Sequence, residues 1–332
     1  MTTIKDIAKA TGFSTTTTSL VLSGKAHDGR VSQETRTKIL ETAHALGYRV
    51  NVAARRLRAN QDAKLMVSVF MALDARSYGM MRFLLGLQSA VEACEHPIEL
   101  VIHSYKSGTI HTQMDAIELT GGAIICNASE DDLHFLETTH VSVPIVLSLR
   151  SSEKYSAVNV NHSLIGEMAA GIFARRGHQH AMVLDSTKYF MSMNQWTDRF
   201  SEMAKQHGME VTQIHSNNDT RGGYEGGLEL SKIQPLPDCV FAVSNAMAIG
   251  VLRACSEHGI KIPGQMELIS IGIDIAEFEA FTHVSISTIF LPIEELAKEC
   301  LKLLVMQVVG ELDKPRYIEL PITYKCRESC GN

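Results

Sequence analysis

The sequence predicts an all-α helix-turn-helix headpiece followed by an α/β body of two doubly wound parallel-sheet lobes. Three observations support this fold class. The first sixty residues contain short helical segments arranged around a glycine turn. Beyond Asn60, continuous apolar runs of strand length alternate with helical segments, a pattern typical of parallel sheets covered on both faces. The alternation continues for about 270 residues, which is more than one such sheet comfortably holds.

The first two helices are expected on either side of a short turn. Thr3 can cap a helix that starts at Ile4, and Gly12 supplies the left-handed residue that ends it. Ser14 is a good cap for a second helix, Thr15–Leu22. The residues expected to face the other helix are Ile4, Ile7 and Ala8 of the first helix and Thr18, Val21 and Leu22 of the second. The positions left on the outward face of the second helix are Thr15, Thr16, Ser19 and Leu20.

A third helix is expected to open at Ser32 and to stop at Gly47. Its helically repeated apolar positions are Ile39, Leu40, Ala43 and Leu46. Two helices separated by a short glycine-containing turn have the spacing of a helix-turn-helix, whose second helix fits the major groove of DNA. The alternative is a helical cap with no role in nucleic-acid binding.

The charge distribution favours DNA binding. The first sixty residues carry ten Lys and Arg against four Asp and Glu, a net charge of +6. The whole chain has a net charge of −6, so the remainder carries −12. A basic lobe on an acidic protein is the electrostatic footprint of a phosphate-binding surface.

The body is expected to alternate strands with helices. Apolar runs predict strands at 65–71, 98–103, 123–126, 144–149, 157–160, 181–184, 239–243 and 268–271. Helical segments between them include 80–94, 165–176, 196–206 and 246–258. Ligands of such folds bind outside the carboxyl ends of the strands, which here predicts a cleft between the lobes.

Five headpiece segments carry a dense and specific pattern: TIKDIA at 3–8, GFS at 12–14, TTSLVLSG at 17–24, VSQETR at 31–36 and LGY at 46–48. They resemble the DNA-binding headpiece of the lactose/galactose-repressor (LacI/GalR) family of bacterial transcriptional regulators. The resemblance continues to the C-terminus. It implies a body similar to the periplasmic sugar-binding proteins, with crossovers between the lobes near Asn161 and Thr288.

The implied domains are a headpiece at 1–48, a hinge helix or linker at 49–61 and an effector-binding and dimerisation body at 62–332. Within the body, the N-lobe is expected at about 62–161 and 289–320, and the C-lobe at about 162–288 and 321–332.

The same resemblance implies which residues of the headpiece contact DNA. Those that match positions reaching base edges in the major groove are Thr15, Thr16 and Leu20. Those that match contacts to the DNA backbone or within the hinge are Thr17, Ser19 and Asn51.

In the hinge, Leu57 matches a leucine that wedges into the minor groove at the centre of the operator. An apolar side chain can unstack a base step while flanking cations, here Arg55, Arg56 and Arg58, hold the phosphates. The alternative is an ordinary core leucine. Val50 stands where the family usually has proline, which is expected to loosen the start of the hinge.

The effector candidates are polar residues expected at strand ends. Arg199 matches an arginine that bonds ligand hydroxyls, and Asp274 matches its acidic partner from the opposite strand. Asn245, Arg150 and Asn161 are further strand-end candidates. A carboxylate, a guanidinium and an amide that converge on one cleft can bind a polyhydroxylated ring. The alternative for each residue is a capping or surface role.

Three departures from the family pattern bear on the effector. Ala246 replaces a common aspartate, Thr220 a frequent aromatic residue and Leu291 a frequent polar residue. With one acid and one aromatic platform fewer, the pocket is expected to suit a glycoside, a modified sugar or a less polar metabolite rather than a plain monosaccharide.

Other signals are consistent with a cytoplasmic protein that has no cofactor. The seven cysteines are odd in number, and neither a signal peptide nor an apolar run of membrane-spanning length is visible. Cys326 and Cys330 lack two further ligands at zinc spacing, so no metal site is expected. No strand leads into the glycine-rich run at 222–227, as a dinucleotide fingerprint requires. His178 and His180 are expected to be structural.

The expected function is a ligand-responsive transcriptional repressor of a carbohydrate-related operon. Its expected partners are double-stranded operator DNA, a small-molecule effector of the sugar or sugar-derivative class, and a second copy of the chain, because paired headpieces read a pseudo-palindrome. A solute-binding protein of the same architecture is the main alternative, and the basic headpiece speaks against it. An enzyme is not expected, since no phosphate loop, nucleophile–base pair or metal set is present in the sequence.

Overall fold

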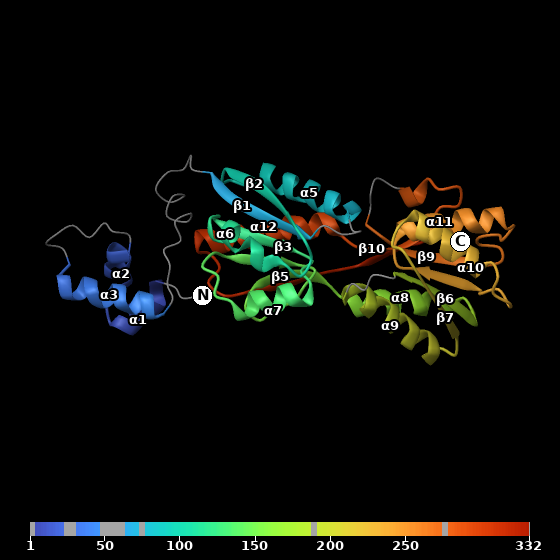
Figure 1. The fold of residues 1–332 in the computed structure, drawn as a ribbon, viewed down its shortest axis with the longest axis horizontal. Helices are drawn as coiled ribbons and strands as arrows, with labels where there is room; N and C mark the ends of the chain where they lie inside the picture. The colour runs from blue at the N-terminus through green and yellow to red at the C-terminus, as the bar shows by residue number, and fades with distance from the viewer. Residues whose placement is uncertain are drawn as a thin grey trace. The chain divides into compact units, whose positions relative to one another are not determined.

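In the computed structural model the headpiece consists of helices packed around a small apolar core. The structure describes residues 4–22, 31–46, 64–72, 77–186, 191–273 and 278–331. The headpiece helices are α1 (Ile4–Thr11), α2 (Thr15–Leu22) and α3 (Gln33–Ala45) (Figure 1). Their core contains Ile7, Val21, Ile39 and Ala43, with Phe13, Leu22 and Val31 packed against it.

The turns of the headpiece follow from the expected capping residues. Gly12 has a φ of +79°, a left-handed conformation that ends α1 at little cost for glycine. At the start of α3, the Ser32 hydroxyl oxygen accepts a hydrogen bond from the Thr35 amide at 3.2 Å. Of the helically repeated apolar positions, Ile39 and Ala43 are buried, whereas Leu40 and Leu46 are 48% and 41% exposed. Helices this short can bury only one narrow stripe of α3.

The first sheet, sheet A, is six-stranded with the order β11-β5-β4-β3-β1-β2. Its strands are β1 (Leu65–Ala72), β2 (Ile98–Tyr105), β3 (Gly122–Cys126), β4 (Ile145–Ser148), β5 (Ser156–Val160) and β11 (Tyr317–Leu320). Strand β1 pairs in parallel with β2 and β3, and β3 pairs in parallel with β4. The helices of this part of the chain are α5 (Ser77–Glu92), α6 (Met114–Glu118), α7 (Glu130–Thr138) and α12 (Ile293–Val309), with the 3-10 turn η1 (Ile110–Gln113).

Both faces of sheet A are covered by helices. Ile117 of α6 and Leu136 of α7 belong to the buried cluster that includes Ala123 of β3. The preceding residue, Gly122, lies against Leu304 of α12. Because successive strand residues point to opposite faces, α6 and α7 cover one face of the sheet and α12 covers the other.

The second sheet, sheet B, is also six-stranded, with the order β12-β10-β9-β8-β6-β7. Its strands are β6 (His180–Ser186), β7 (Glu210–Ser216), β8 (Cys239–Ala242), β9 (Glu267–Gly272), β10 (Ser287–Phe290) and β12 (Thr323–Lys325). All recorded pairs are parallel except β12, which runs antiparallel to β10. The helices are α8 (His162–Arg175), α9 (Met191–Gln206), α10 (Thr220–Leu230) and α11 (Asn245–Glu257), with 3-10 turns η2 (Phe278–Ala280) and η3 (Glu328–Cys330).

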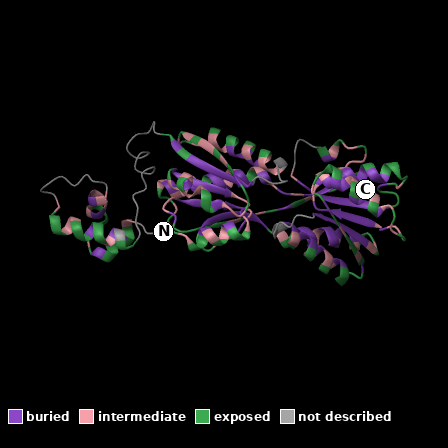
Figure 2. Cartoon of the chain, in the orientation of Figure 1, coloured by how far each residue is buried: buried purple, intermediate pink, exposed green. Residues whose placement is uncertain are grey.

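Helix pairs cover the two faces of sheet B. Leu184 of β6 lies against Gly226 of α10, whereas the next residue, Asp185, lies against Thr197 of α9. The pair α8–α9 therefore packs on one face and the pair α10–α11 on the other (Figure 1). The inner strands of both sheets are largely buried, whereas the outer strands β2, β7, β11 and β12 are mostly partly buried or exposed (Figure 2).

The chain passes between the sheets after β5, after β10 and after β11. By compactness it divides into a first unit of Met1–Ala72, Ala90–Ala157 and Glu299–Tyr317 and a second unit of Leu73–Ser89, Val158–Lys298 and Ile318–Asn332. Among the described residues, no helix combines the length and apolar character needed to cross a bilayer.

The predicted fold class is confirmed: a helix-turn-helix headpiece precedes two parallel-sheet α/β lobes. All eight predicted strands of the body are present, with small shifts at their ends. The strands that the apolar pattern does not predict are β7, β10, β11 and β12. All four lie at or next to a sheet edge and are short or polar.

Candidate functional site

Helix α2 presents the polar face that the sequence predicts. The turn Gly12–Ser14 leads into α2, and the Ser14 hydroxyl oxygen accepts a hydrogen bond from the Thr17 amide at 3.0 Å. Thr18 is buried and donates from its hydroxyl to the Ser14 carbonyl at 3.0 Å. Thr15 and Thr16 are exposed. The remaining expected contacts, Thr17, Ser19 and Leu20, are partly exposed.

Thr17 differs from its neighbours because its hydroxyl lies 2.8 Å from that of Ser14. This contact ties Thr17 to the turn, while Thr15 and Thr16 are open to a partner. The expected hinge contacts Asn51, Arg55 and Leu57 lie outside the described residues, and so does the effector candidate Asp274.

The expected strand-end position of Arg199 is wrong, because Arg199 lies in the middle of α9. Its guanidinium donates to Glu202 at 2.8 Å and to Glu167 of α8 at 3.2 Å, and these hydrogen bonds raise its pKa. The neighbouring α9 residues Trp196, Thr197 and Phe200 are buried. Their helical spacing turns Arg199 toward the partly exposed α8–α9 seam.

Arg150 and Asn161 each hold local backbone. Arg150 is buried at the end of β4 and donates to the carbonyls of Ala128 and Leu149. The Asn161 side chain accepts a hydrogen bond from the Leu164 amide at 3.1 Å and caps α8. The Asn161 contact matches the capping alternative, and neither residue lies on sheet B.

A polar group gathers at the carboxyl edge of sheet B. Asn218 follows β7, Ser244 and Asn245 follow β8, and Glu279 follows β9. The Ser244 hydroxyl donates to the Asn218 side-chain oxygen at 2.6 Å. The Asn245 amide nitrogen donates to a Glu279 carboxylate oxygen at 3.0 Å. We name these four residues the polar edge.

Sheet A has an unusual backbone at the corresponding ends of β3 and β4. Asn127 and Leu149, which directly follow these neighbouring strands, have φ values of 53° and 58°. The Asn127 amide donates to the Ser148 carbonyl at 2.9 Å, which extends the ladder by one bond. Asparagine tolerates this left-handed conformation, whereas leucine does not, so Leu149 is a strained residue.

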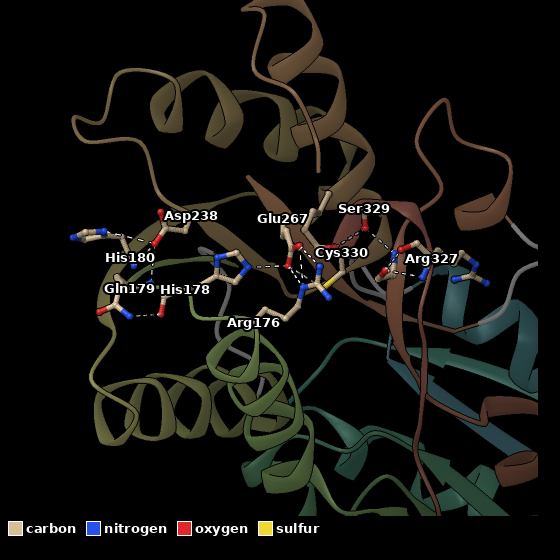
Figure 3. Close-up of polar contacts among 11 residues, drawn as sticks. Arg176, His178, Gln179, His180, Asp238, Glu267, Arg327, Ser329 and Cys330 are labelled. Atoms are coloured by element: carbon tan, nitrogen blue, oxygen red, sulfur yellow. Dashed lines mark hydrogen bonds and ion pairs between the residues drawn. The ribbon is translucent and has the colours of Figure 1, made fainter. Parts of the chain in front are cut away.

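The opposite, amino edge of sheet B holds a charged network (Figure 3). The Arg176 guanidinium pairs with both carboxylate oxygens of Glu267, at 2.6 and 2.7 Å, and a His178 ring nitrogen lies 2.8 Å from Glu267. The Cys330 thiol donates to the same carboxylate at 3.4 Å. Burial by itself raises the pKa of Glu267, but the hydrogen bonds from Arg176 and His178 outweigh it and hold that pKa below its ordinary value.

The same network secures the C-terminal segment. The Ser329 hydroxyl donates to the Leu268 carbonyl at 2.6 Å, and the Arg327 guanidinium donates to the Ile286 carbonyl at 2.8 Å. His180 lies beside Asp238, whose carboxylate accepts the His180 backbone amide at 2.9 Å. These contacts give His178 and His180 structural partners. In the described ranges, no group of His, Cys, Asp or Glu is arranged to hold a metal ion.

Of the polar edge, sequence reasoning predicted Asn245 and missed Asn218, Ser244 and Glu279 as candidates. Glu279 lies in a segment with neither strand nor helix periodicity, so no pattern marked it. Its signal in the structure is burial, since a glutamate that is 2% exposed is rare unless it is paired.

Comparisons with known proteins agree with this architecture. Residues 3–51 match the model of bacterial regulatory proteins of the lacI family, and residues 170–330 match a periplasmic binding protein-like domain. The probable HTH-type transcriptional repressor ExuR of Bacillus subtilis is 22% identical, with 90% of this chain and 89% of the relative covered. The HTH-type transcriptional regulator AscG of Escherichia coli is 26% identical, with 95% of each chain covered.

Solved structures show the same fold. A LacI family transcription regulator from Clostridium acetobutylicum has a TM-score of 0.74 and 28% identity, with 78% of this chain and 99% of that chain covered. The lac repressor dimer bound to operator and an anti-inducer has a TM-score of 0.71 and 17% identity, with 100% of this chain and 99% of that chain covered.

A DNA-reading headpiece joined to a two-lobed body of the solute-binding type defines a class of protein, the DNA-binding regulators that carry their own ligand sensor. Both parts are present in this one chain. Relatives match it over nearly its whole length. The chain belongs to the LacI family of bacterial regulatory proteins. It is a transcriptional regulator and not an enzyme.

Proposed function

We propose that this regulator is a ligand-responsive repressor that binds operator DNA as a homodimer and senses a sugar or sugar derivative. Relatives named as repressors, among them ExuR of Bacillus subtilis and PurR of Mannheimia succiniciproducens, support repression. The observation that carries the proposal is the exposed hydroxyl face of α2, on a basic headpiece that is joined to a body with a polar edge. As a DNA-binding regulator, it would work in the cytoplasm.

For DNA, the proposal assigns base contacts to Thr15, Thr16 and Leu20. Hydroxyls bond to more than one base, and a leucine contacts a thymine methyl group, so α2 can read sequence without long polar side chains. Thr17, Ser19 and Asn51 are assigned to the DNA backbone or the hinge. Leu57 is assigned to the minor groove, and Arg55 to the phosphates beside it.

The DNA assignment is tested by selecting binding sites for the full chain from a random duplex pool. We expect a pseudo-palindromic consensus whose half-sites follow the two-fold symmetry of a dimer. Thr16→Ala should weaken binding to that consensus by about tenfold, since one base contact is worth about 1–3 kcal/mol. Thr37→Ala is the matched control, because Thr37 is an exposed threonine of α3 in the same headpiece.

For the effector, the proposal assigns contacts to Asn245 and Asp274. Solved regulators of the same fold support the sugar class: one is a CelR–cellobiose complex at 19% identity, and another, from Enterococcus faecalis, holds bound ribose at 18% identity. Arg199, Arg150 and Asn161 stay within the proposal, but each would have to share or exchange a partner that it already holds.

For assembly, the proposal assigns a homodimer. Helix α5 exposes Met81 and Leu85, one turn apart, at 48% and 47%. The edge strand β2 exposes Ile102 at 53%. Exposed apolar side chains at helical spacing and along a sheet edge are features that a second copy would cover. Sedimentation equilibrium of the full chain should give the mass of a dimer, and a monomer at micromolar concentration would contradict this assignment.

The whole proposal is tested by linkage. A thermal-shift screen identifies sugars that raise the unfolding temperature, because a ligand that binds only the folded state stabilises it. Adding such a sugar should change the affinity for the selected operator by about 5–150-fold, which is the usual range of allosteric coupling. A chain that selects no duplex sequence overturns the DNA role. A sugar that binds without changing operator affinity overturns the coupling.

A further inference from the structure

Glu279 is a buried carboxylate at the carboxyl edge of sheet B. It is 2% exposed and lies on the 3-10 turn η2. Among the described residues, its carboxylate accepts a hydrogen bond from the neutral amide of Asn245 at 3.0 Å. Within the part of the chain that the structure describes, no Lys, Arg or His pairs with the Glu279 carboxylate. Burying such a group costs several kcal/mol unless it is compensated, so this position demands donors around it.

The space for this carboxylate is made by a glycine. A Cβ built on Gly272, the last residue of β9, would lie 3.2 Å from the same Glu279 oxygen and 3.0 Å from the Thr288 Cβ. Any larger residue at this strand end would push on the carboxylate. The sequence therefore keeps room for Glu279 at the position where sheet B meets its ligand edge.

Glu279 also determines how Asn245 is oriented. The Asn245 side-chain oxygen accepts a hydrogen bond from the Ala246 amide at 2.8 Å, while its nitrogen donates to Glu279. With both ends held, the amide cannot flip its donor and acceptor. Among the described residues, one N–H of Asn245 is left for another partner, because an amide nitrogen has two.

We propose that Glu279 is a positioning and specificity-determining residue of the effector site. Its carboxylate fixes the Asn245 amide and makes the polar edge select ligands that present hydroxyl or amino donors over ligands that present a carboxylate. The inference rests on the proposed function, because Asn245 must contact the effector. The selection follows from charge, since a buried anion attracts donors and repels a second anion in a medium of low dielectric constant.

The test measures dissociation constants by titration calorimetry on the full chain. The probes are glucose and galactose, their 2-amino derivatives and their uronic acids, which form two matched series. Wild-type protein should bind the neutral or amino sugars at least about tenfold more tightly than the uronic acid of the same series, because like charges brought together are costly. Glu279→Gln should reduce this ratio by about tenfold, since it keeps the shape and removes the charge.

Two further variants keep the test decisive if Glu279→Gln folds poorly. Glu279→Asp retains the charge and should retain part of the ratio. Gly272→Ala leaves the charge in place but displaces the carboxylate. It should therefore change the ratio between the dissociation constants of the uronic acid and of the neutral or amino sugar. Glu267→Gln is the matched control, because it neutralises a buried glutamate at the opposite edge of the same sheet. It should lower stability and leave the ratio unchanged.

Asn245→Ala separates failure of this inference from failure of the proposed function. If Asn245→Ala abolishes probe binding while Glu279→Gln leaves the ratio unchanged, the polar edge is the effector site and the role of Glu279 is overturned. If Asn245→Ala binds the probes as wild-type does, the effector site itself is misplaced. If no probe binds wild-type protein, the carbohydrate assignment falls and this inference falls with it.

Discussion

At the scale of single residues, Leu149 has a backbone conformation that is unfavourable for leucine. Its φ of 58° is left-handed, which costs a residue with a Cβ roughly 1–2 kcal/mol. Asparagine adopts this conformation more readily because its short polar side chain bonds locally. Leu149→Asn is therefore expected to raise the free energy of unfolding by about 1 kcal/mol, measured by urea denaturation.

The control for this prediction is Leu164→Asn. Leu164 is 39% exposed and lies within α8, where the backbone is an ordinary helix. This change should give no gain, because asparagine is a poorer helix former than leucine. A similar gain in both variants would mean that the strain at Leu149 does not exist. A gain at Leu149 that also weakened effector binding would indicate that the strain serves the site.

Glu267 gives the second prediction at this scale. Its lowered folded-state pKa means that its contribution is present above its unfolded pKa of about 4.3 and is lost as pH falls through the lower folded value. Glu267→Gln should lower the free energy of unfolding at pH 7 by about 3 kcal/mol, at the lower end for a broken buried pair, because Arg176 is 37% exposed. The variant should also lose less stability than wild type between about pH 5 and pH 3.

A surface pair provides the contrast for Glu267. Glu225 pairs with Arg221 one turn earlier on α10, and the two side chains are 49% and 87% exposed. Glu225→Gln should change the free energy of unfolding by less than about 0.5 kcal/mol, since exposed pairs are screened by solvent. An equal loss in both glutamate variants would contradict the importance of burial at Glu267.

At the scale of elements, α10 and α11 approach so closely that their contact excludes side chains. A Cβ on Gly250 would lie 2.2 Å from the Thr220 carbonyl oxygen and 2.3 Å from the Tyr224 amide nitrogen, both in the backbone of α10. Backbone atoms cannot rotate away as a flexible side chain can. Gly250→Ala should therefore destabilise the protein by about 1–3 kcal/mol or more, measured by thermal or urea unfolding.

Gly171 is the matched control for this helix pair. It lies inside α8, and the nearest atom to an added Cβ is the end of the Arg175 side chain, at 3.5 Å. Gly171→Ala should stabilise by about 0.5–1 kcal/mol, because alanine favours a helix interior more than glycine does. If Gly250→Ala lowers the free energy of unfolding and Gly171→Ala raises it, close packing at Gly250 is the cause. Stabilisation in both would contradict the contact between α10 and α11.

Elements differ in how far their sequence predicts them. Central strands such as β3 and β8 are buried on both faces and read as continuous apolar runs. Edge strand β7 exposes most of its residues and carries Glu210, Gln213 and His215, so no apolar run marks it. Strands β11 and β12 consist of Tyr317–Leu320 and Thr323–Lys325, and such short segments become strands through their neighbours.

At the scale of the whole molecule, regulation depends on the hinge between headpiece and body. Leu57→Ala is expected to weaken binding to the selected operator by about tenfold or more, because a wedge in the minor groove is lost while the phosphate contacts remain. Fluorescence anisotropy at physiological salt measures this loss. Binding to non-specific duplex should change little, and the unfolding temperature should match wild type. Unchanged operator affinity would remove Leu57 from the DNA interface.

The sequence by itself determined what local physics controls. Helical periodicity and the caps around Gly12 predicted the headpiece, apolar runs predicted the central strands, and the excess of basic residues predicted a DNA-binding lobe. These features depend on residues a few positions apart, so a pattern in the chain is enough to show them.

Only the tertiary structure decided which distant side chains meet. Asn245 and Glu279 are 34 residues apart, and Arg176 and Glu267 are 91 apart, yet sheet B brings each pair within hydrogen-bond distance. The turn of α9 likewise directed Arg199 to Glu167 and Glu202, although its sequence motif suggested a ligand contact. Such contacts follow from strand order and helix packing, because parallel strands distant in sequence end at one edge, and no local pattern encodes which residues share it.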